Sequence, residues 1–482
     1  MMAHNEITLT GWFRPDRLSS VRNDSFQGNG EAMAKLVCID CLVDSYLQEK
    51  YEHNDVEECD YCGRERPVVD FDELLSECQD AIWSSFAYAE QPGSVIHHGY
   101  PPVGHSLYDV VETVLGAEDT SLLEDLDAEI REGWSEEGED DDPFFIEETF
   151  ASAQMTSDWV KMQQSLQFES RLVNPFVGVV LERIFSGIDK LHTATGSQSA
   201  ITIAGAGQPL KSFQRARSFQ SEEGMTLALK HPEKHLGPTP RGKGSAGRMN
   251  AAGISVFYGA TDDETAMAEV RPPVGSWVVT ATFEIVRPLR LLNLSDLGGI
   301  CPDASLSYFD PVRSEQAQRC AFLRELQQQM LMPVMPESAD QGYLITQAIA
   351  DFLATSESLN LDGILFPSVQ GAQGASPGHN VILFHKASGV EKTEDHEAMD
   401  HADLWELDED RWSFYPQIWE AGPSPHDSLP SSMSQAPIPD PCLRLNRERI
   451  MIHKIQGVRF SYETDRVNYV PWTEGPRYYG PR

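Results

Sequence analysis

Residues 247–271 read GRMNAAGISVFYGATDDETAMAEVR, and this stretch decides how the second half of the chain folds. Its apolar run at 255–258 predicts a short strand. Thr261 is followed three residues later by Glu264, which is the spacing of a capping box at the start of a helix. The pattern therefore predicts a strand that turns sharply into a helix beginning near Asp262.

The predicted helix carries a carboxylate close to its apolar stripe. Ala266 and Val270 face the core at helical spacing, and Glu269 lies beside them, near the domain body rather than on the outer face. Two interpretations follow from this position. Glu269 pairs structurally with Arg271, or it is positioned for chemistry.

The sequence around this stretch mixes strand and helix patterns. Residues 276–286 (SWVVTATFEIV) alternate between an apolar face and a face that carries Thr280 and Thr282. Further short strands are expected at 363–366 and 381–384, and amphipathic helices at 318–332 and 343–355. The fold class predicted for this half is α+β.

Three side chains of the central stretch form a candidate catalytic set. Arg248 precedes the strand, Tyr258 ends it, and the turn brings Tyr258 and Glu269 to the same rim. Cleavage of the bond between ribose and nicotinamide needs a guanidinium for the diphosphate, an aromatic face for nicotinamide and a carboxylate for the oxocarbenium charge. The alternatives are a surface ion pair for Arg248 and an ordinary strand aromatic for Tyr258.

Four motifs together resemble a known family, the RES domain. They are FQRARSF (213–219), the central stretch extended to Ser276, LDGILFPSVQ (361–370) and GHNVILFHK (378–386). The resemblance covers about residues 210–387. It implies an ADP-ribosyltransferase-like fold that degrades NAD or transfers its ADP-ribose, commonly as the toxin of a bacterial toxin–antitoxin pair.

The resemblance also implies the site residues. By motif match the family's Arg, Tyr, Glu and Ser fall on Arg248, Tyr258, Glu269 and Ser368, and Arg215 matches the basic position that opens the domain. Arg215 and Arg248 would hold the diphosphate, Tyr258 would stack on nicotinamide, and Ser368 would hydrogen-bond the amide or ribose. Glu269 would bond the ribose hydroxyls and stabilise the cation.

Some of these side chains also have ordinary structural interpretations. The alternative for Arg215 is a surface ion pair, and Arg217 is its neighbour in the same motif. Ser368 is also compatible with a role in shaping the loop that contains Gly371 and Gly374. His379 is interpreted as a loop histidine, and the alternative is an additional general acid or base.

The first half of the chain contains a candidate metal site. Cys38/Cys41 and Cys59/Cys62 are two C-x-x-C pairs separated by seventeen residues, a zinc-ribbon spacing. Four thiolates leave no open position, so the zinc would be structural. The alternatives are two disulfides or a chance cluster. This region resembles the HEPN/RES N-terminal domain over roughly 31–190, where helical patterns predominate.

The composition limits the partners. No apolar run is long enough to cross a bilayer and the N-terminus lacks a signal-peptide layout, so the expected compartment is the cytoplasm. The formal net charge of −38 repels nucleic acid, while the local excess of Lys and Arg over 211–248 suits a small phosphorylated ligand. The expected partners are NAD and, as a toxin-like or defence protein, a protein antitoxin or a macromolecular acceptor of ADP-ribose.

The predicted organisation has five parts. They are a loose N-terminal arm (1–30), a zinc-binding helical module (31–190), a RES catalytic domain (205–390), an acidic Pro/Ser-rich linker (391–440) and C-terminal strands (441–482). The principal hypothesis is an NAD-consuming enzyme that uses water, phosphate or a macromolecule as acceptor. The alternative is a non-catalytic zinc-helical adaptor with an inactive RES fold.

Overall fold

The computed structural model describes residues 35–89, 91, 100–117, 120–132, 144–193, 199–332, 339–368, 378–391, 401–408, 411–419, 440–458, 464 and 466–467. The chain divides into two compact units. The first comprises Met1–Asp80 and Ser106–Asp142, and the second comprises Ala81–His105 and Pro143–Arg482. The predicted arm at 1–30 and the loop with Gly371 and Gly374 lie outside the described residues.

The first unit is mixed α/β, which corrects the expectation of a helical module. Its strands form a three-stranded sheet in the order β1-β3-β2. The elements in the first unit's part of the chain are β1 (Leu36–Cys38), η2 (Ile39–Cys41), α1 (Ser45–Tyr51), β2 (Val56–Glu58), β3 (Glu65–Asp70), α2 (Phe71–Ser85), α4 (Leu107–Leu115) and α5 (Thr120–Glu132). Strands β1 and β2 have three residues each, too few to produce a readable period, so the sequence pattern did not predict this sheet.

Helix α4 illustrates how local sequence sets the bounds of an element in this unit. Ser106 caps its start through a capping box with Asp109, and Gly116 ends it in the left-handed conformation with a φ of 64°. Between these ends the apolar residues are buried, with Leu107 and Leu115 fully enclosed. Packing of this stripe, rather than helix propensity alone, stabilises so short a helix.

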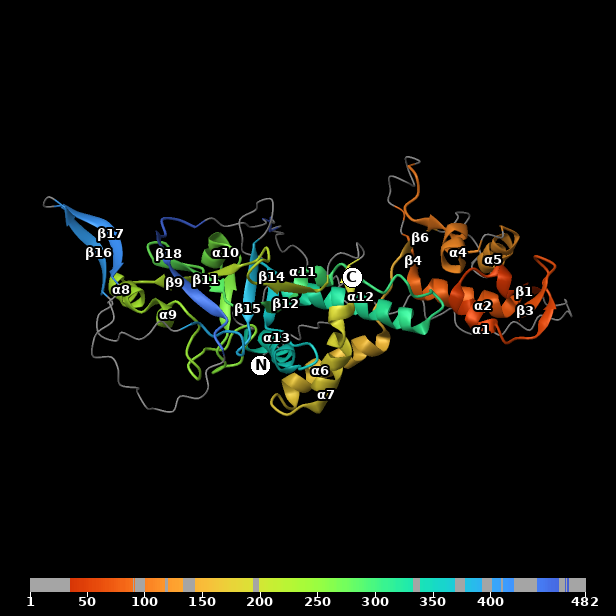
Figure 1. Cartoon of the computed structure of the whole chain (residues 1–482), viewed down its shortest axis with the longest axis horizontal. Helices are drawn as coiled ribbons and strands as arrows, with labels where there is room; N and C mark the ends of the chain where they lie inside the picture. The colour runs from red at the N-terminus through yellow and green to blue at the C-terminus, as the bar shows by residue number, and fades with distance from the viewer. Residues whose placement is uncertain are drawn as a thin grey trace, which may run out of the picture. The chain divides into compact units, whose positions relative to one another are not determined.

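The second unit is built on a mixed eight-stranded sheet, which makes it α+β (Figure 1). The strand order is β18-β11-β9-β10-β15-β14-β12-β8, and the pairs are antiparallel except for β12 with β14. The strands are β8 (Ile201–Ala204), β9 (Ser212–Phe219), β10 (Phe257–Ala260), β11 (Trp277–Ile285), β12 (Leu289–Asn293), β14 (Gly363–Pro367), β15 (His379–Leu383) and β18 (Leu443–Lys454). The strands expected near 276–286, 363–366 and 381–384 are thereby confirmed.

Helices cover one face of this sheet. Side chains from β12, β14 and β15 share a core with α6 (Ala153–Phe168), α7 (Pro175–Phe185), α12 (Pro311–Leu331) and α13 (Ala339–Thr355). Trp159 of α6 meets Phe322 of α12 edge-to-face at 5.5 Å between ring centroids. Helices α6 and α7 thus belong to the second unit, although the sequence pattern groups them with the N-terminal module. Helices α12 and α13 confirm the two amphipathic helices expected there.

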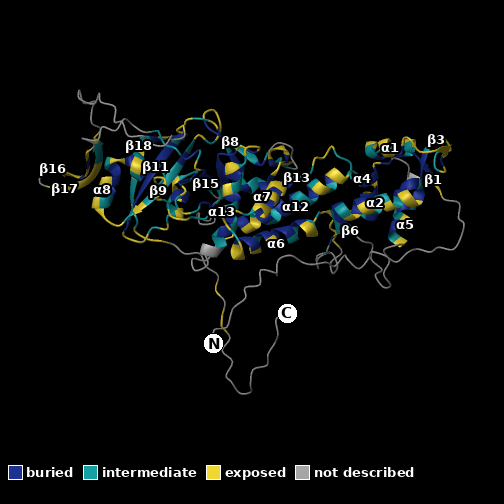
Figure 2. Cartoon of the chain, turned by 90° about the horizontal axis from the view of Figure 1, so that it is seen from below, coloured by how far each residue is buried: buried dark blue, intermediate teal, exposed yellow. Residues whose placement is uncertain are grey.

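The opposite face of the sheet is covered by a second core. This core combines the sheet with α8 (Glu222–Lys230) and with a hairpin of β16 (His401–Asp408) and β17 (Arg411–Trp419). Ala402 and Leu404 of β16 are buried in it, whereas much of the rest of the hairpin is exposed (Figure 2). The hairpin lies within the predicted linker at 391–440, where the adjoining sheet and helix supply the apolar surface that this segment lacks by itself.

Strand β11 is buried on both sides. The expected polar face is not solvated, because α10 (Asp263–Glu269) covers it, and Ala266 of α10 shares a small core with Val278 of β11 and with Ala216 and Ala260. The hydroxyl of Thr282 donates to Gln214 Oε1 at 2.8 Å, and that of Thr280 lies 3.0 Å from His453 Nε2. These bonds satisfy polar groups that burial would otherwise leave without partners.

Shorter elements connect these layers. They are β4 (Phe86–Tyr88), β5 (His105–Ser106), β6 (Phe144–Glu147), η3 (Ile188–Lys190), β7 (His192–Thr193), α9 (Pro232–His235), α11 (Leu294–Leu297) and β13 (Ile300–Cys301). At the start of the predicted C-terminal segment, β18 pairs with β11 from Ile285↔Leu443 to Trp277↔Lys454, with a register shift between Ala281 and Thr282.

Replacing Phe283 tests the importance of the second core. Phe283 is fully buried on β11 and meets Phe257 edge-to-face at 5.0 Å. We expect Phe283→Ala to destabilise the second unit by about 3–5 kcal/mol, because the substitution leaves a cavity that the sheet cannot close. Urea unfolding followed by circular dichroism measures this loss. Val179→Ala, at a position 58% exposed on α7, serves as control. An equal loss of stability in both variants would contradict the importance of Phe283 to the second core.

Candidate functional site

The eight-stranded sheet opens between β9 and β10. These strands are paired at Ala260↔Gln214, after which β9 continues along β11 and β10 continues along β15. A cavity of about 490 Å³ lies at this opening. Its lining comprises Arg215, Ala216, Arg217, Ser218, Gly247, Arg248, Tyr258, Gly259, Ala266, Glu269, Val270, Arg271, Leu331, Tyr343, Phe366, Pro367, Asn380 and Ile382. Four of the five predicted site residues therefore share one cavity.

Arg215 spans the opening. Its Nη1 donates to the backbone oxygen of Tyr258 at 2.8 Å, and its guanidinium lies 5.1 Å from the centroid of the Phe257 ring. Its Nε is buried and has no hydrogen-bond partner among the described residues. Burial, with a contribution from neighbouring Arg217, lowers the pKa of Arg215 to about 9. The group stays cationic at neutral pH, so an anion in the cavity would offset the cost of burying it.

Arg248 is fixed by the ends of α12 and α13. Its Nη2 donates to the backbone oxygens of Met330 and Met332, and its backbone oxygen accepts from the Thr346 hydroxyl at 2.5 Å. The Nε of Arg248 is buried without a partner within the described part of the chain. Burial lowers the pKa of this guanidinium as well. Arg215 and Arg248 therefore line one cavity as half-buried cations, and each keeps a buried Nε without a partner among the described residues.

Tyr258 contributes its ring rather than its hydroxyl. The hydroxyl donates to Asn250 Oδ1 at 2.7 Å and accepts from the backbone N–H of Met249 at 3.2 Å. Burial raises the pKa of Tyr258 to about 12. Its hydroxyl therefore remains protonated and occupied, which suits an aromatic contact and does not suit acid–base catalysis.

Glu269 is the last residue of α10. Asp262 caps the start of this helix by accepting from Thr265 N–H at 2.8 Å, so the expected helix is confirmed, whereas the cap is Asp262 and not Thr261. The carboxylate of Glu269 accepts a hydrogen bond from Asn380 Nδ2 at 3.3 Å. Glu269 is solvent-exposed and lines the cavity, so a ligand can reach it.

Ser368 and His379 lie beside the cavity rather than in its lining. Ser368 is 7% exposed, and its N–H donates to the backbone oxygen of Gly378 at 2.8 Å. Phe366 and Pro367, directly before Ser368, do line the cavity. His379 begins β15, and its Nε2 lies 3.4 Å from the Ser295 hydroxyl.

The lining includes three further side chains of interest that were not among the predicted site residues. Asn380, Tyr343 and Phe366 come from β15, α13 and β14. Asn380 is a polar residue at the start of the apolar run NVILF. A polar residue among apolar neighbours was the signal by which the sequence could have indicated it as a site residue. Tyr343 and Phe366 look like core residues in the sequence, and only the folded chain brings them to this cavity.

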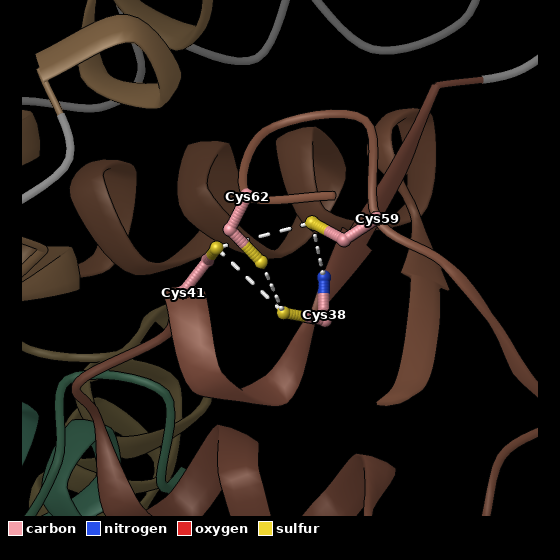
Figure 3. A group of neighbouring side chains, drawn as sticks. All are labelled: Cys38, Cys41, Cys59 and Cys62. Carbon is pink, nitrogen blue, oxygen red and sulfur yellow. Dashed lines mark hydrogen bonds between the residues drawn. The ribbon is translucent and has the colours of Figure 1, made fainter. Parts of the chain in front are cut away.

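The four clustered cysteines form a separate candidate metal site in the first unit. Figure 3 shows their sulfur atoms turned toward one another, with distances of 3.4 Å for Cys38–Cys62, 3.6 Å for Cys38–Cys41 and 3.8 Å for Cys41–Cys59. All four sulfurs lie within 4.8 Å of one another. A tetrahedron with metal–sulfur bonds of about 2.3 Å has sulfurs about 3.8 Å apart, so the cluster fits such an ion.

The cysteine geometry argues against disulfides. A disulfide requires sulfurs about 2.05 Å apart, and all eight cysteines of the chain are free thiols. Burial and the neighbouring thiols raise the pKa of Cys38 to about 11 and that of Cys41 further. Although burial opposes it, backbone N–H groups around Cys59 lower the pKa of that thiol.

Comparisons with known proteins match two family models to the chain. The RES domain matches residues 215–407, and the HEPN/RES N-terminal domain 1 matches residues 52–175. No curated protein and no solved structure matches the chain. Among the described residues, no helix is both long and apolar enough to cross a membrane.

The charges of the cavity predict that it binds a diphosphate. Its lining holds Arg215, Arg217, Arg248 and Arg271 against the single carboxylate of Glu269. We expect saturating pyrophosphate to raise the melting temperature by at least about 3 °C, because an anion compensates the buried guanidiniums. Differential scanning calorimetry measures the shift. Arg215→Gln should abolish it, while Arg449→Gln, on the exposed surface of β18, should retain it. A shift that survives Arg215→Gln would contradict this assignment.

Proposed function

The chain contains a RES domain preceded by a HEPN/RES N-terminal domain 1, and from this we propose that it consumes NAD by cleaving the bond between nicotinamide and ribose. The RES family is associated with NAD-degrading toxin activity. The observation that carries the proposal is the cavity at the β9–β10 opening, where Arg215, Arg248, Tyr258 and Glu269 meet. The wider α+β architecture is compatible with an ADP-ribosyltransferase-like fold.

The charge distribution of the cavity suits a dinucleotide. The guanidiniums of Arg215 and Arg248, which line the cavity, hold the diphosphate. Tyr258 and Phe366 offer aromatic surface to the nicotinamide ring. Ser368, next to this surface in the chain, hydrogen-bonds the nicotinamide amide or the ribose. The exposed carboxylate of Glu269 accepts from the ribose hydroxyls.

Glu269 stabilises the charge that develops when the bond breaks. The N-glycosidic electron pair moves to the pyridinium nitrogen, so nicotinamide leaves neutral and the ribose carbon becomes an oxocarbenium ion. A carboxylate beside the ribose lowers the energy of this cation more than that of the ground state. The acceptor, whether water, phosphate or a macromolecule, then adds its oxygen or nitrogen to the same carbon and loses a proton.

A toxin-like or defence role follows from this chemistry, because uncontrolled loss of NAD harms the cell that contains the enzyme. Such an enzyme requires restraint by a partner, and a protein antitoxin is the partner that the family suggests. The cytoplasm, where NAD is abundant, is the matching compartment.

Glu269→Gln tests the proposal directly. We expect the wild-type protein to release nicotinamide from NAD and the variant to be slower by roughly 100- to 1000-fold, because the neutral amide no longer stabilises the cation. Chromatography of NAD, nicotinamide and ADP-ribose products over time measures both rates. Parallel reactions with inorganic phosphate, and with a cell extract and labelled NAD, identify the acceptor.

The matched control is Glu264→Gln, which changes an exposed carboxylate on the same helix. This variant should keep the wild-type rate. Intact NAD in every wild-type reaction, the extract included, would overturn the proposed function and favour the adaptor interpretation.

We also propose that Cys38, Cys41, Cys59 and Cys62 bind one structural zinc ion. The sulfur spacing fits a closed tetrahedron, which supports a structural rather than a catalytic metal. The cluster ties β1 and η2 to the segment between β2 and β3. The sheet of this unit has three strands, and a metal link of this kind adds to the stability that burial of apolar side chains gives so small a unit.

Removal of one ligand tests the zinc assignment. We expect the purified protein to contain about one zinc ion per chain, and Cys41→Ser to lose it and to lower the melting temperature of the first unit. Elemental analysis and calorimetry measure these effects. Cys301→Ser, outside the cluster, should keep the metal. Zinc should also be released on acidification, because protons compete for the thiolates. Equal metal content in both variants would refute the assignment.

A further inference from the structure

We propose that Asn380 is a ligand-binding residue that, together with Glu269, recognises the cis-diol of the ribose. This inference rests on the proposed function and adds the residue that makes the site selective for a ribosyl group with both hydroxyls. The side-chain amide of Asn380 is buried and hydrogen-bonds Glu269 through its nitrogen, whereas its oxygen has no partner among the described residues.

Asn380 is held rigidly in the centre of the sheet. It is directly opposite Ala260 of β10 on one side and Phe366 of β14 on the other. Directly opposed residues of antiparallel strands point to the same face, and Asn380 and Phe366 both line the cavity. Only 5% of the surface of Asn380 is exposed. The position of its amide is therefore set by two neighbouring strands and not by a loop.

The hydrogen bond to Glu269 fixes the orientation of this amide. Asn380 Nδ2 lies 3.3 Å from Glu269 Oε2. An ionised carboxylate only accepts hydrogen bonds, so the NH₂ end must face Glu269 and the oxygen must face away. That oxygen, Oδ1, is buried and has no hydrogen-bond partner among the described residues. An asparagine with a purely structural role would have both ends of its amide satisfied.

The unused oxygen matches the chemistry of the proposed substrate. Oδ1 and the Glu269 carboxylate are two acceptors held close together by the bond between the two side chains. A cis-diol presents two adjacent O–H donors, so each hydroxyl can donate to one of the two acceptors. A phosphate does not fit next to Oδ1, because the phosphate oxygens and Oδ1 are all hydrogen-bond acceptors. The other donors in NAD are the amide of nicotinamide, the amino group of adenine and the hydroxyls of the adenosine ribose, and the experiment separates the nicotinamide ribose from these.

The test compares binding of NAD with binding of two analogues that lack the 2′- or the 3′-hydroxyl of the nicotinamide ribose. Calorimetry on the full chain gives the dissociation constants for the wild type, Asn380→Ala and Asn380→Leu. Leu keeps the branched shape and the number of heavy atoms of the Asn side chain without its polar atoms, so it replaces Ala if the smaller side chain impairs folding. Melting curves report the folding of each variant.

We expect the wild type to bind NAD roughly 10- to 100-fold more tightly than at least one deoxy analogue, because the analogue leaves a buried acceptor unsatisfied. Both Asn380 variants should bind NAD and that analogue with nearly equal affinity. Asn446→Ala serves as matched control, since Asn446 donates to Glu284 at 2.8 Å elsewhere in the same sheet. This variant should keep the wild-type discrimination.

Two other results have distinct meanings. Binding of NAD with unchanged discrimination in the Asn380 variants would overturn the inference alone and assign Oδ1 to another donor, such as the nicotinamide amide. Neither binding nor cleavage of NAD by the wild type would overturn the proposed function and this inference with it.

Discussion

The divergence of β9 from β10 is the constraint on which the site depends. Had the two strands stayed paired beyond Ala260↔Gln214, their backbone groups would have closed the sheet and filled the space of the cavity. Instead each strand follows another neighbour, and the side chain of Arg215 bridges the opening by donating to the backbone oxygen of Tyr258. One interaction thus satisfies part of the broken ladder and places a buried cation at the cavity.

The rigidity of the surrounding chain gives this opening its defined shape. The loop before β10 is fastened to α13, whose Gln347 Nε2 donates to the backbone oxygen of Gly247 at 2.8 Å. A Cβ atom at Gly247 would lie 2.6 Å from the hydroxyl oxygen of Tyr258 and 2.5 Å from Asn250 Oδ1, so only glycine permits the close packing of this loop. Sites held in this way keep their geometry without a ligand, which lowers the entropic cost of binding.

The sequence predicted the parts with a local pattern and missed those that depend on tertiary contacts. Strand β11 was readable from its regular alternation, and helix α10 from the capping signal at its start. The motif match selected Arg215, Arg248, Tyr258 and Glu269, which the fold brings to one cavity, although their roles stay predictions. Periodicity could not show that α6 and α7 pack in the second unit, because an apolar stripe does not specify its partner. Asn380 was missed for a related reason, since its importance comes from a contact across 111 residues of sequence.

A crystal structure of Glu269→Gln soaked with NAD tests the central claim most directly, because the variant should bind the substrate and cleave it slowly. The account predicts the diphosphate within hydrogen-bonding distance of the Arg215 and Arg248 guanidiniums, at the opening between β9 and β10. It also predicts the nicotinamide ribose beside residue 269. Density for NAD at another surface, or an unliganded cavity at saturating NAD, would contradict the claim that this opening is the substrate site.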